Sequence, residues 1–255
     1  MLFVIDIGNT NITVGGFEGE TLRFEARLAS DPRRTGDQYA GDLAAVLTVH
    51  GVTARETDSA IICSVVPELT KAIRHAFCAL TGQEPLVVGP GVRMGLDIKI
   101  DTPAQLGTDL AVGAVGALAK YPLPCLIIDL GTATTLFVLD GKGSFRGGVI
   151  AAGIRSTLDA LTSHTAQLSS VPIEAPKKVI GTNTADCMKA GLIIGAAAMI
   201  DGLCDRMEQE LGAPFATVVA TGGLAREVVP HCRRAIVTDD RLILDALRLI
   251  WLKNQ

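Results

Sequence analysis

Two stretches of this sequence decide the fold, because they repeat one pattern. Leu2–Thr10 reads LFVIDIGNT, and Leu126–Thr135 reads LIIDLGTATT. In each, an apolar run typical of a buried strand leads to an Asp, an apolar residue, a Gly and small polar residues. A further apolar segment follows each, at Ile12–Phe17 and Leu136–Leu139. Each stretch therefore predicts a strand, a tight glycine turn and a second strand, and the wide spacing favours two similar domains over a solenoid.

Strands and helices alternate along the rest of the chain, which predicts an α/β fold. Helices are expected at 37–50, 67–80, 103–120, 185–210 and 241–252, and strands at 59–66, 86–88 and 217–220. Two prolines interrupt the chain near residues 120–124. We therefore predict domains at 1–120 and 121–255, with the terminal helix at 241–252 available to pack back on the first domain.

Composition excludes several classes of protein. The chain has 255 residues, 48% of them hydrophobic and 20% charged, with a net charge of −4. A disordered chain is excluded, and the absence of a basic block argues against a nucleic-acid partner. The longest strongly apolar run, Gly191–Ile200, is shorter than the roughly 18 residues of a membrane span. The N-terminus lacks a basic start, so no signal peptide is expected.

The six cysteines include no CxxC pair. Cys63, Cys125 and Cys204 lie in apolar runs, which predicts reduced core residues in a cytoplasmic protein. The adjacent His231 and Cys232 do not have the spacing of a metal site, so no zinc is expected.

The two glycine turns are the best candidates for chemistry, because P-loop, dinucleotide and nucleophile-elbow motifs are all absent. A carboxylate at the end of a buried strand needs a cation or hydrogen-bond donors. The Gly permits close approach of the backbone, and such a turn suits phosphate oxygens. A plain Asx turn in a hairpin is the alternative for each copy alone, but two copies favour phosphate binding. A third glycine motif, Ala220–Ala225 (ATGGLA), follows the strand at 217–220.

The order of these three motifs resembles the actin–hexokinase–Hsp70 architecture of two phosphate loops and an adenosine loop. The resemblance implies two similar actin-like (ribonuclease H-like) domains with mixed, largely parallel sheets, flanking helices and a ligand cleft between them.

Four further segments resemble the type III pantothenate kinases. They are Pro103–Asp109 (PAQLGTD), Gly147–Gly153 (GGVIAAG), Gly181–Thr184 (GTNT) and Ile62–Pro67 (ICSVVP). The resemblance runs from residue 1 to about residue 250. It implies phosphorylation of pantothenate by ATP with Mg²⁺, a monovalent cation (K⁺ or NH₄⁺) as activator, and a homodimer that completes the substrate pocket.

The resemblance also implies roles for individual residues. Asp109 would be the catalytic base, Asp129 would bind the monovalent cation and Asp6 would face Mg²⁺. The expected ATP and phosphate contacts are Asp6, Ile7, Gly8, Asn9, Thr10, Asn11, Ile12, Thr13, Gly131, Thr132, Gly222 and Gly223. The expected substrate pocket is Ile100, Gly107, Thr108, Asp109, Leu110 and Thr184.

The sequence departs from the family pattern at two positions. Leu110 stands where the family usually has Arg, and Ile100 where it usually has Tyr. A missing Arg removes a charge-assisted contact to the carboxylate of pantothenate, for which Arg155 is a candidate replacement. Two alternatives stay open: a kinase of another small hydroxylated metabolite, and a nucleotide-binding regulatory protein with weakened catalysis. Retention of Asp109 argues against the latter.

Overall fold

The computed structural model describes residues 1–255, which divide into two compact units. Unit 1 comprises residues 1–95, 104–116 and 242–255, and unit 2 comprises residues 96–103 and 117–241. Each unit is built on one sheet that contains both parallel and antiparallel strands. The predicted α/β class with two mixed sheets is confirmed.

Unit 1 contains a five-stranded sheet in the order β3-β2-β1-β4-β5. The strands are β1 (Leu2–Ile7), β2 (Asn11–Glu18), β3 (Thr21–Ala29), β4 (Ser59–Ser64) and β5 (Leu86–Val87). The helices that contribute to it are α1 (Gly36–Val49), α2 (Pro67–Thr81), α3 (Thr108–Lys120, which continues into unit 2) and α8 (Leu242–Lys253). A short 3-10 turn lies at Ala54–Glu56.

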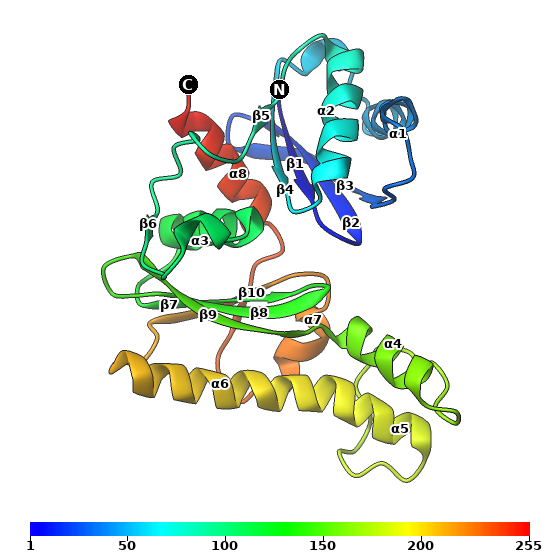
Figure 1. Cartoon of the computed structure of the whole chain (residues 1–255), viewed down its shortest axis with the longest axis vertical. Helices are drawn as coiled ribbons and strands as arrows, with labels where there is room; N and C mark the ends of the chain where they lie inside the picture. Colours follow the sequence, from blue (N-terminus) through cyan, green and yellow to red (C-terminus); the bar gives the residue numbers. More distant parts are fainter. The chain divides into compact units, whose positions relative to one another are not determined.

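Alternation along β1 divides its side chains between the two faces of the sheet. Phe3, Ile5 and Ile7 pack into a core with residues of α1 and α2, such as Leu43 and Phe77. Figure 1 shows these two helices beside the strands of unit 1. The even-numbered residues of β1 lie on the opposite face, and Asp6 is the last of them in the strand.

Unit 2 contains a six-stranded sheet in the order β11-β10-β7-β8-β9-β6. The strands are β6 (Asp97–Ile98), β7 (Cys125–Leu130), β8 (Ala133–Leu139), β9 (Ser144–Ala152), β10 (Thr217–Thr221) and β11 (Val237–Thr238). The helices are α4 (Ile154–His164), α5 (Thr184–Lys189), α6 (Gly195–Leu211) and α7 (Ala225–Val228), with a π-helical turn at Ala190–Ile194 and a 3-10 turn at Val229–His231. A further 3-10 turn, Pro103–Gln105, lies where the chain passes from unit 2 into unit 1.

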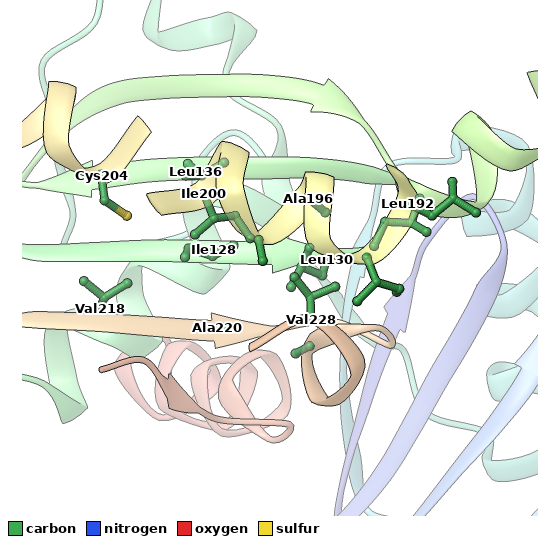
Figure 2. Close-up of a cluster of buried hydrophobic side chains, with 14 of the residues drawn as sticks. Ile128, Leu130, Leu136, Leu192, Ala196, Ile200, Cys204, Val218, Ala220 and Val228 are labelled. Carbon is green, nitrogen blue, oxygen red and sulfur yellow. The ribbon is translucent and has the colours of Figure 1, made fainter. Parts of the chain in front are cut away.

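The long helix α6 runs along one face of this sheet (Figure 1). Its residues Ala196, Ile200 and Cys204 project toward apolar side chains of β7, β8 and β10 (Figure 2). By length and composition alone the helical stretch Thr184–Leu211 is long and apolar enough to cross a membrane. In this structure one face of that stretch belongs to the core of unit 2.

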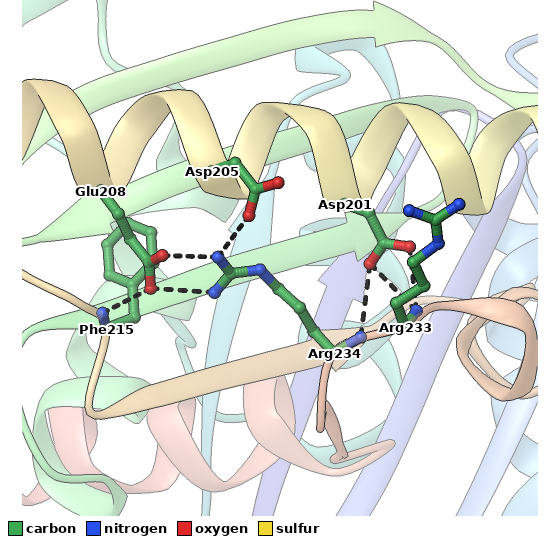
Figure 3. Close-up of polar contacts among 6 residues, drawn as sticks. All are labelled: Asp201, Asp205, Glu208, Phe215, Arg233 and Arg234. Carbon is green, nitrogen blue, oxygen red and sulfur yellow. Dashed lines mark hydrogen bonds and ion pairs between the residues drawn. The ribbon is translucent and has the colours of Figure 1, made fainter.

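An arginine network ties α6 to the segment before β11 (Figure 3). The Arg234 guanidinium donates to Glu208 Oε1 at 2.8 Å and to Asp205 Oδ1 at 2.7 Å. Asp201 accepts from the backbone N–H of Arg233 at 2.9 Å. The Arg234 guanidinium holds the pKa of Glu208 below its ordinary value. These contacts fasten the segment to a helix that is already anchored by its apolar face.

The sequence repeat is also a structural repeat. Asp6 in β1 lies opposite Thr13 in β2, and Asp129 in β7 lies opposite Thr135 in β8, both in antiparallel pairs. On its other side β1 pairs in parallel with β4, and β7 pairs in parallel with β10. The strand order β3-β2-β1-β4 in unit 1 therefore matches β9-β8-β7-β10 in unit 2.

Two helices differ from their sequence-based prediction. The helix expected from residue 103 is a 3-10 turn at Pro103–Gln105, and α3 begins only at Thr108. Gly107 lies in the break, and Asp109 is thereby placed in the first turn of α3. The helix expected at 185–210 contains the π-helical turn at Ala190–Ile194, which adds residues locally to the turn.

Candidate functional site

The first glycine turn connects β1 to β2 and is held from both sides. The Gly8 N–H donates to the Asn11 carbonyl at 3.0 Å. Ser30 follows β3 directly: its Oγ donates to the Gly8 carbonyl at 2.6 Å, and its N–H donates to the Thr10 carbonyl at 3.0 Å. The side chains of Asn9 and Thr10 are exposed at this turn. The turn is thus a fixed backbone loop with polar side chains on its surface.

Not every residue expected at the first phosphate loop offers its side chain. Ile7 and Ile12 are fully buried and belong to the core of unit 1, so only their backbone groups are available to a ligand. Asn11 is exposed, and Thr13 lies opposite Asp6 in the β1–β2 pair. Because antiparallel partners project to the same face, Thr13 shares the face of Asp6.

Two carboxylates of unit 1, those of Asp6 and Asp109, influence the pKa of one buried thiol, Cys63. Cys63 is fully buried and pairs with Asp6 across the parallel β1–β4 ladder. The start of α3 lies at the end of β4, because the Thr108 hydroxyl donates to the Ser64 carbonyl at 2.7 Å. Burial, followed by the carboxylates of Asp6 and Asp109, raises the pKa of the Cys63 thiol well above its ordinary value. Asp6 and Asp109 therefore both lie near Cys63, on elements far apart in the sequence.

Asp109 has the environment of a proton acceptor. Burial raises the pKa of its carboxyl group, and the N–H of Leu110, which donates to its Oδ1 at 2.8 Å, opposes that rise. A Cβ atom at Gly107 would lie 2.6 Å from the same oxygen, so glycine leaves room for the carboxylate. A carboxylate with a raised pKa is a better general base near neutral pH.

The second glycine turn, between β7 and β8, is held like the first. The Gly131 N–H donates to the Ala133 carbonyl at 3.1 Å. The Thr132 carbonyl accepts from the Gly153 N–H at 3.2 Å and from the Ser156 hydroxyl at 2.9 Å. Gly153 and Ser156 follow β9, just as Ser30 follows β3. The Thr132 side chain is exposed on this turn.

The third glycine motif packs against Asp129. Gly222 has a φ of 93°. A Cβ atom there would lie 2.4 Å from Asp129 Oδ1 and 2.6 Å from the Leu130 nitrogen. The Leu224 N–H donates to the Leu130 carbonyl at 3.2 Å. The fold of unit 2 thus brings Gly222 and the neighbouring Gly223 to the end of β7, beside the second glycine turn.

An unpartnered hydroxyl lies next to Asp129. Thr135 is opposite Asp129 in the β7–β8 pair, and its Oγ1 is buried with no hydrogen-bond partner. A buried hydroxyl without a partner is costly. Oxygen atoms of this kind, beside a carboxylate, are the ligands that hard cations prefer. The residues present therefore suit a bound cation at Asp129.

The expected substrate residues are divided between the two units. Gly107, Thr108 and Leu110 belong to unit 1, and Leu110 places an apolar side chain directly after Asp109. Ile100 belongs to unit 2, where its Cγ2 would lie 3.6 Å from a Cβ atom at Gly147. Thr184 begins α5 in unit 2 and is exposed.

Sequence reasoning missed four residues of this candidate site. No individual role is predicted for Ser30, Thr135 or Ser156, and Cys63 is predicted only as a core residue that lies in the Ile62–Pro67 segment. Three of them lie within or shortly after recognised motifs: Thr135 ends the Leu126–Thr135 stretch, Cys63 lies in the Ile62–Pro67 segment, and Ser156 follows the Gly147–Gly153 segment. Ser30 has no such signal, because only the β2–β3 hairpin returns it to the first turn.

Comparison with known proteins identifies the family. The model of the type III pantothenate kinase family matches residues 2–206. A type III pantothenate kinase of an Exiguobacterium species is 38% identical over 255 residues, covering 100% of both chains. One from Rhodospirillum centenum is 42% identical over 258 residues, covering 100% of this chain and 99% of that protein.

The solved structures agree on the fold. The ROK hexokinase of Thermus thermophilus aligns with a TM-score of 0.52 at 14% sequence identity, covering 100% of this chain and 99% of that one. At that identity the likeness concerns the fold alone, and it supports the two-domain actin-like architecture. The family model and the full-length relatives lead to one conclusion: this chain belongs to the type III pantothenate kinase family.

Proposed function

We propose that this chain transfers the γ-phosphoryl group of ATP to pantothenate, forming ADP and 4′-phosphopantothenate on the way to coenzyme A. Family membership over the full length supports the reaction. The observation that carries the site is that Asp6 and Asp109 lie around one buried residue, Cys63. Phosphoryl transfer needs a group that binds the metal–nucleotide complex and a group that accepts the hydroxyl proton, and this pair provides both.

Each of the two braced turns offers groups that suit the phosphates of a nucleotide, and Asp6 beside the first turn would face the divalent cation. Backbone amides and hydroxyls of such turns suit phosphate oxygens, and a carboxylate oxygen suits a hydrated Mg²⁺. When bound, Mg²⁺ neutralises phosphate charge. In this proposal the first turn carries Asn9 and Thr10, the second carries Thr132, and Gly222–Gly223 receives the adenosine.

Asp109 accepts the proton of the attacking hydroxyl in this proposal. Its carboxyl group has a raised pKa and lies in the first turn of α3. Asp109→Asn keeps the shape but cannot take a proton, so kcat is expected to fall about 10²–10⁴-fold. Affinity for Mg·ATP, measured by calorimetry, should change little. An Asn variant that keeps more than half of wild-type turnover would remove Asp109 from this role.

Asp129 holds a monovalent cation in this proposal, with Thr135 as a second oxygen ligand. The buried, unpartnered hydroxyl of Thr135 beside the carboxylate supports it. Activity should be low in Tris or sodium buffers and rise with K⁺ or NH₄⁺. Thr135→Val, which keeps the shape and removes the oxygen, should raise the K⁺ concentration for half-maximal activity. Equal rates with and without K⁺ would contradict the cation site.

The acceptor pocket is the place where this chain departs from its family. With Leu110 in place of Arg, binding of pantothenate lacks one charge-assisted contact worth roughly 1.5–3 kcal/mol, or about 10–150-fold in affinity. We therefore expect a raised KM for pantothenate. Leu110→Arg should lower it, while Arg155→Ala should raise it further if Arg155 is the replacement donor. Steady-state kinetics with pantothenate and its neutral carboxyl-amide analogues test both variants.

A second candidate function follows from Leu110: a kinase of the same fold for another small hydroxylated molecule. An apolar residue directly after the proposed base favours a less anionic acceptor. An ATP-consumption screen over pantothenate and a panel of small alcohols decides between the two functions. Turnover of another alcohol but not pantothenate would replace the first function. ATP binding without turnover of any acceptor would favour a regulatory protein.

We also propose that the enzyme is a cytoplasmic homodimer. Val179 and Ile180, just before the Gly181–Thr184 segment, are 64% and 84% exposed, which suits residues covered by a second copy. All six cysteines are free, as expected in a reducing compartment. Light scattering should give a dimer for wild type and a shift to monomer for Ile180→Glu. A monomeric wild type with full activity would contradict the dimer.

A further inference from the structure

The two glycine turns share a hydrogen-bonding arrangement that the sequences of the turns do not reveal. In each, a serine hydroxyl from beyond the third strand of the meander donates to a carbonyl oxygen of the turn. Ser30 Oγ donates to the Gly8 carbonyl at 2.6 Å, and Ser156 Oγ donates to the Thr132 carbonyl at 2.9 Å. The serines are 22 and 24 residues from their acceptors along the chain. The same arrangement thus occurs twice, on the two copies of the repeat.

A backbone N–H accompanies each hydroxyl. The Ser30 N–H donates to the Thr10 carbonyl at 3.0 Å, and the Gly153 N–H donates to the Thr132 carbonyl at 3.2 Å. In the first turn the two donors thus fix two different carbonyls. In the second turn both donors converge on one oxygen. Removal of the Ser156 hydroxyl therefore leaves Thr132 a donor, whereas removal of the Ser30 hydroxyl takes the side-chain donor from Gly8.

The direction of these hydrogen bonds affects how well each turn can bind an anion. A carbonyl oxygen carries partial negative charge and repels a phosphate, while backbone N–H groups and hydroxyl donors attract it. A hydroxyl that donates to the carbonyl fixes the peptide plane and compensates its negative end. A loop whose carbonyls are fixed in this way loses less conformational freedom when the ligand binds.

We propose that Ser30 and Ser156 are matched positioning residues, each of which holds a carbonyl group of the phosphate loop in its own unit in the orientation that suits phosphate binding. The inference rests on the proposed function, because it takes the two turns as the phosphate loops. Neither serine needs to touch the nucleotide. Ser30 acts on the loop between β1 and β2, and Ser156 acts on the loop between β7 and β8.

The test is a set of single variants with a matched control. Ser30→Ala and Ser156→Ala each remove one hydroxyl, and Ser30→Thr keeps it. Ser163→Ala is the control: Ser163 lies on α4 with Ser156, but its hydroxyl donates to Ala160 within the helix at 3.3 Å. For each variant the KM values for ATP and pantothenate, kcat, the affinity for Mg·ADP by calorimetry, and the Tm are measured.

Ser30→Ala should weaken Mg·ADP binding and raise the KM for ATP about tenfold, the usual consequence of losing one hydrogen bond. Ser156→Ala should have a smaller effect, about threefold, because Gly153 still donates to Thr132. The KM for pantothenate should stay within about twofold in both. Ser30→Thr and Ser163→Ala should behave like wild type.

Unchanged nucleotide affinity in both alanine variants would overturn the inference. So would an equal loss in Ser163→Ala, or a rise in the KM for pantothenate as large as that for ATP, since either would indicate general loosening. If Ser30→Ala does not fold, the comparison of nucleotide affinity between Ser156→Ala and Ser163→Ala tests the same inference. A wild type that binds Mg·ADP but does not phosphorylate pantothenate would refute the proposed function alone, because calorimetry still measures the effect of each serine.

Discussion

Gly222→Ala is the substitution whose effect follows most directly from the geometry. Gly222 has a φ of 93°, which an L side chain rarely adopts, and its Cβ atom would lie 2.4 Å from Asp129 Oδ1. The backbone strain alone costs roughly 1–2 kcal/mol. Non-bonded heavy atoms usually lie about 3.5–4.0 Å apart, so the Asp129 carboxylate and the Leu130 backbone, 2.6 Å from the same Cβ atom, must shift by about 1 Å relative to residue 222. Such overpacking adds about 1–3 kcal/mol.

Gly212→Ala is the matched control. Gly212 ends α6 with a φ of 72°, and a Cβ atom there would meet nothing within 4 Å. It therefore carries the backbone strain without the contact to Asp129. In a chain of this size each kcal/mol lowers the Tm by about 2–4 °C. Gly212→Ala should lower the free energy of unfolding only by the backbone strain, roughly 1–2 kcal/mol. Gly222→Ala should lower the free energy of unfolding by about twice as much or more.

The kinetics separate the two variants further. Because Gly222→Ala displaces the Asp129 carboxylate, it should raise the KM for ATP and weaken activation by K⁺. Gly212→Ala should keep both at wild-type values. Calorimetric melting and K⁺-dependent rates measure these effects. If the two variants lose equal stability and both keep wild-type kinetics, the contact between Gly222 and Asp129 has no role in the site.

Three further predictions concern charge and exposure. Because burial raises the pKa of Asp109, the ionised form of Asp109 opposes folding. Asp109→Asn should therefore raise the Tm at pH 7. Melting curves should show this gain in Tm shrinking as the pH is lowered toward 3.8. Arg234 holds the pKa of Glu208 below its ordinary value. Arg234→Met should lower the free energy of unfolding by about 1–3 kcal/mol at pH 7 without changing kcat. Urea titrations should show this loss of stability shrinking as the pH falls below 4.5. Iodoacetamide followed by mass spectrometry should label the exposed Cys187 in the folded protein and leave the buried Cys63 unlabelled until the chain unfolds; early labelling of Cys63 would contradict its burial.

The sequence alone determined the central strands and their repeat. The apolar runs at the start of β1 and β7 are buried on both faces, so every residue carries the signal. The Asp and Gly that end each run mark the turn whatever the rest of the chain does. The strands β3 and β9 were not predicted. Both alternate between exposed and half-buried residues over much of their length. Polar side chains interrupt β3 and two glycines interrupt β9, so neither strand forms a long apolar run.

Only the tertiary structure decided which residues serve those turns. Cys63 reads as a core residue until the parallel ladder places it beside Asp6 and the start of α3 brings Asp109 near it. Ser30 carries no local signal and Ser156 only its place after the Gly147–Gly153 segment, because each becomes a donor only when the meander returns the chain to the turn. An apolar run in the sequence by itself indicates a buried strand. Hydrogen bonds between distant residues depend instead on strand register and on where each strand ends, and both are set by packing.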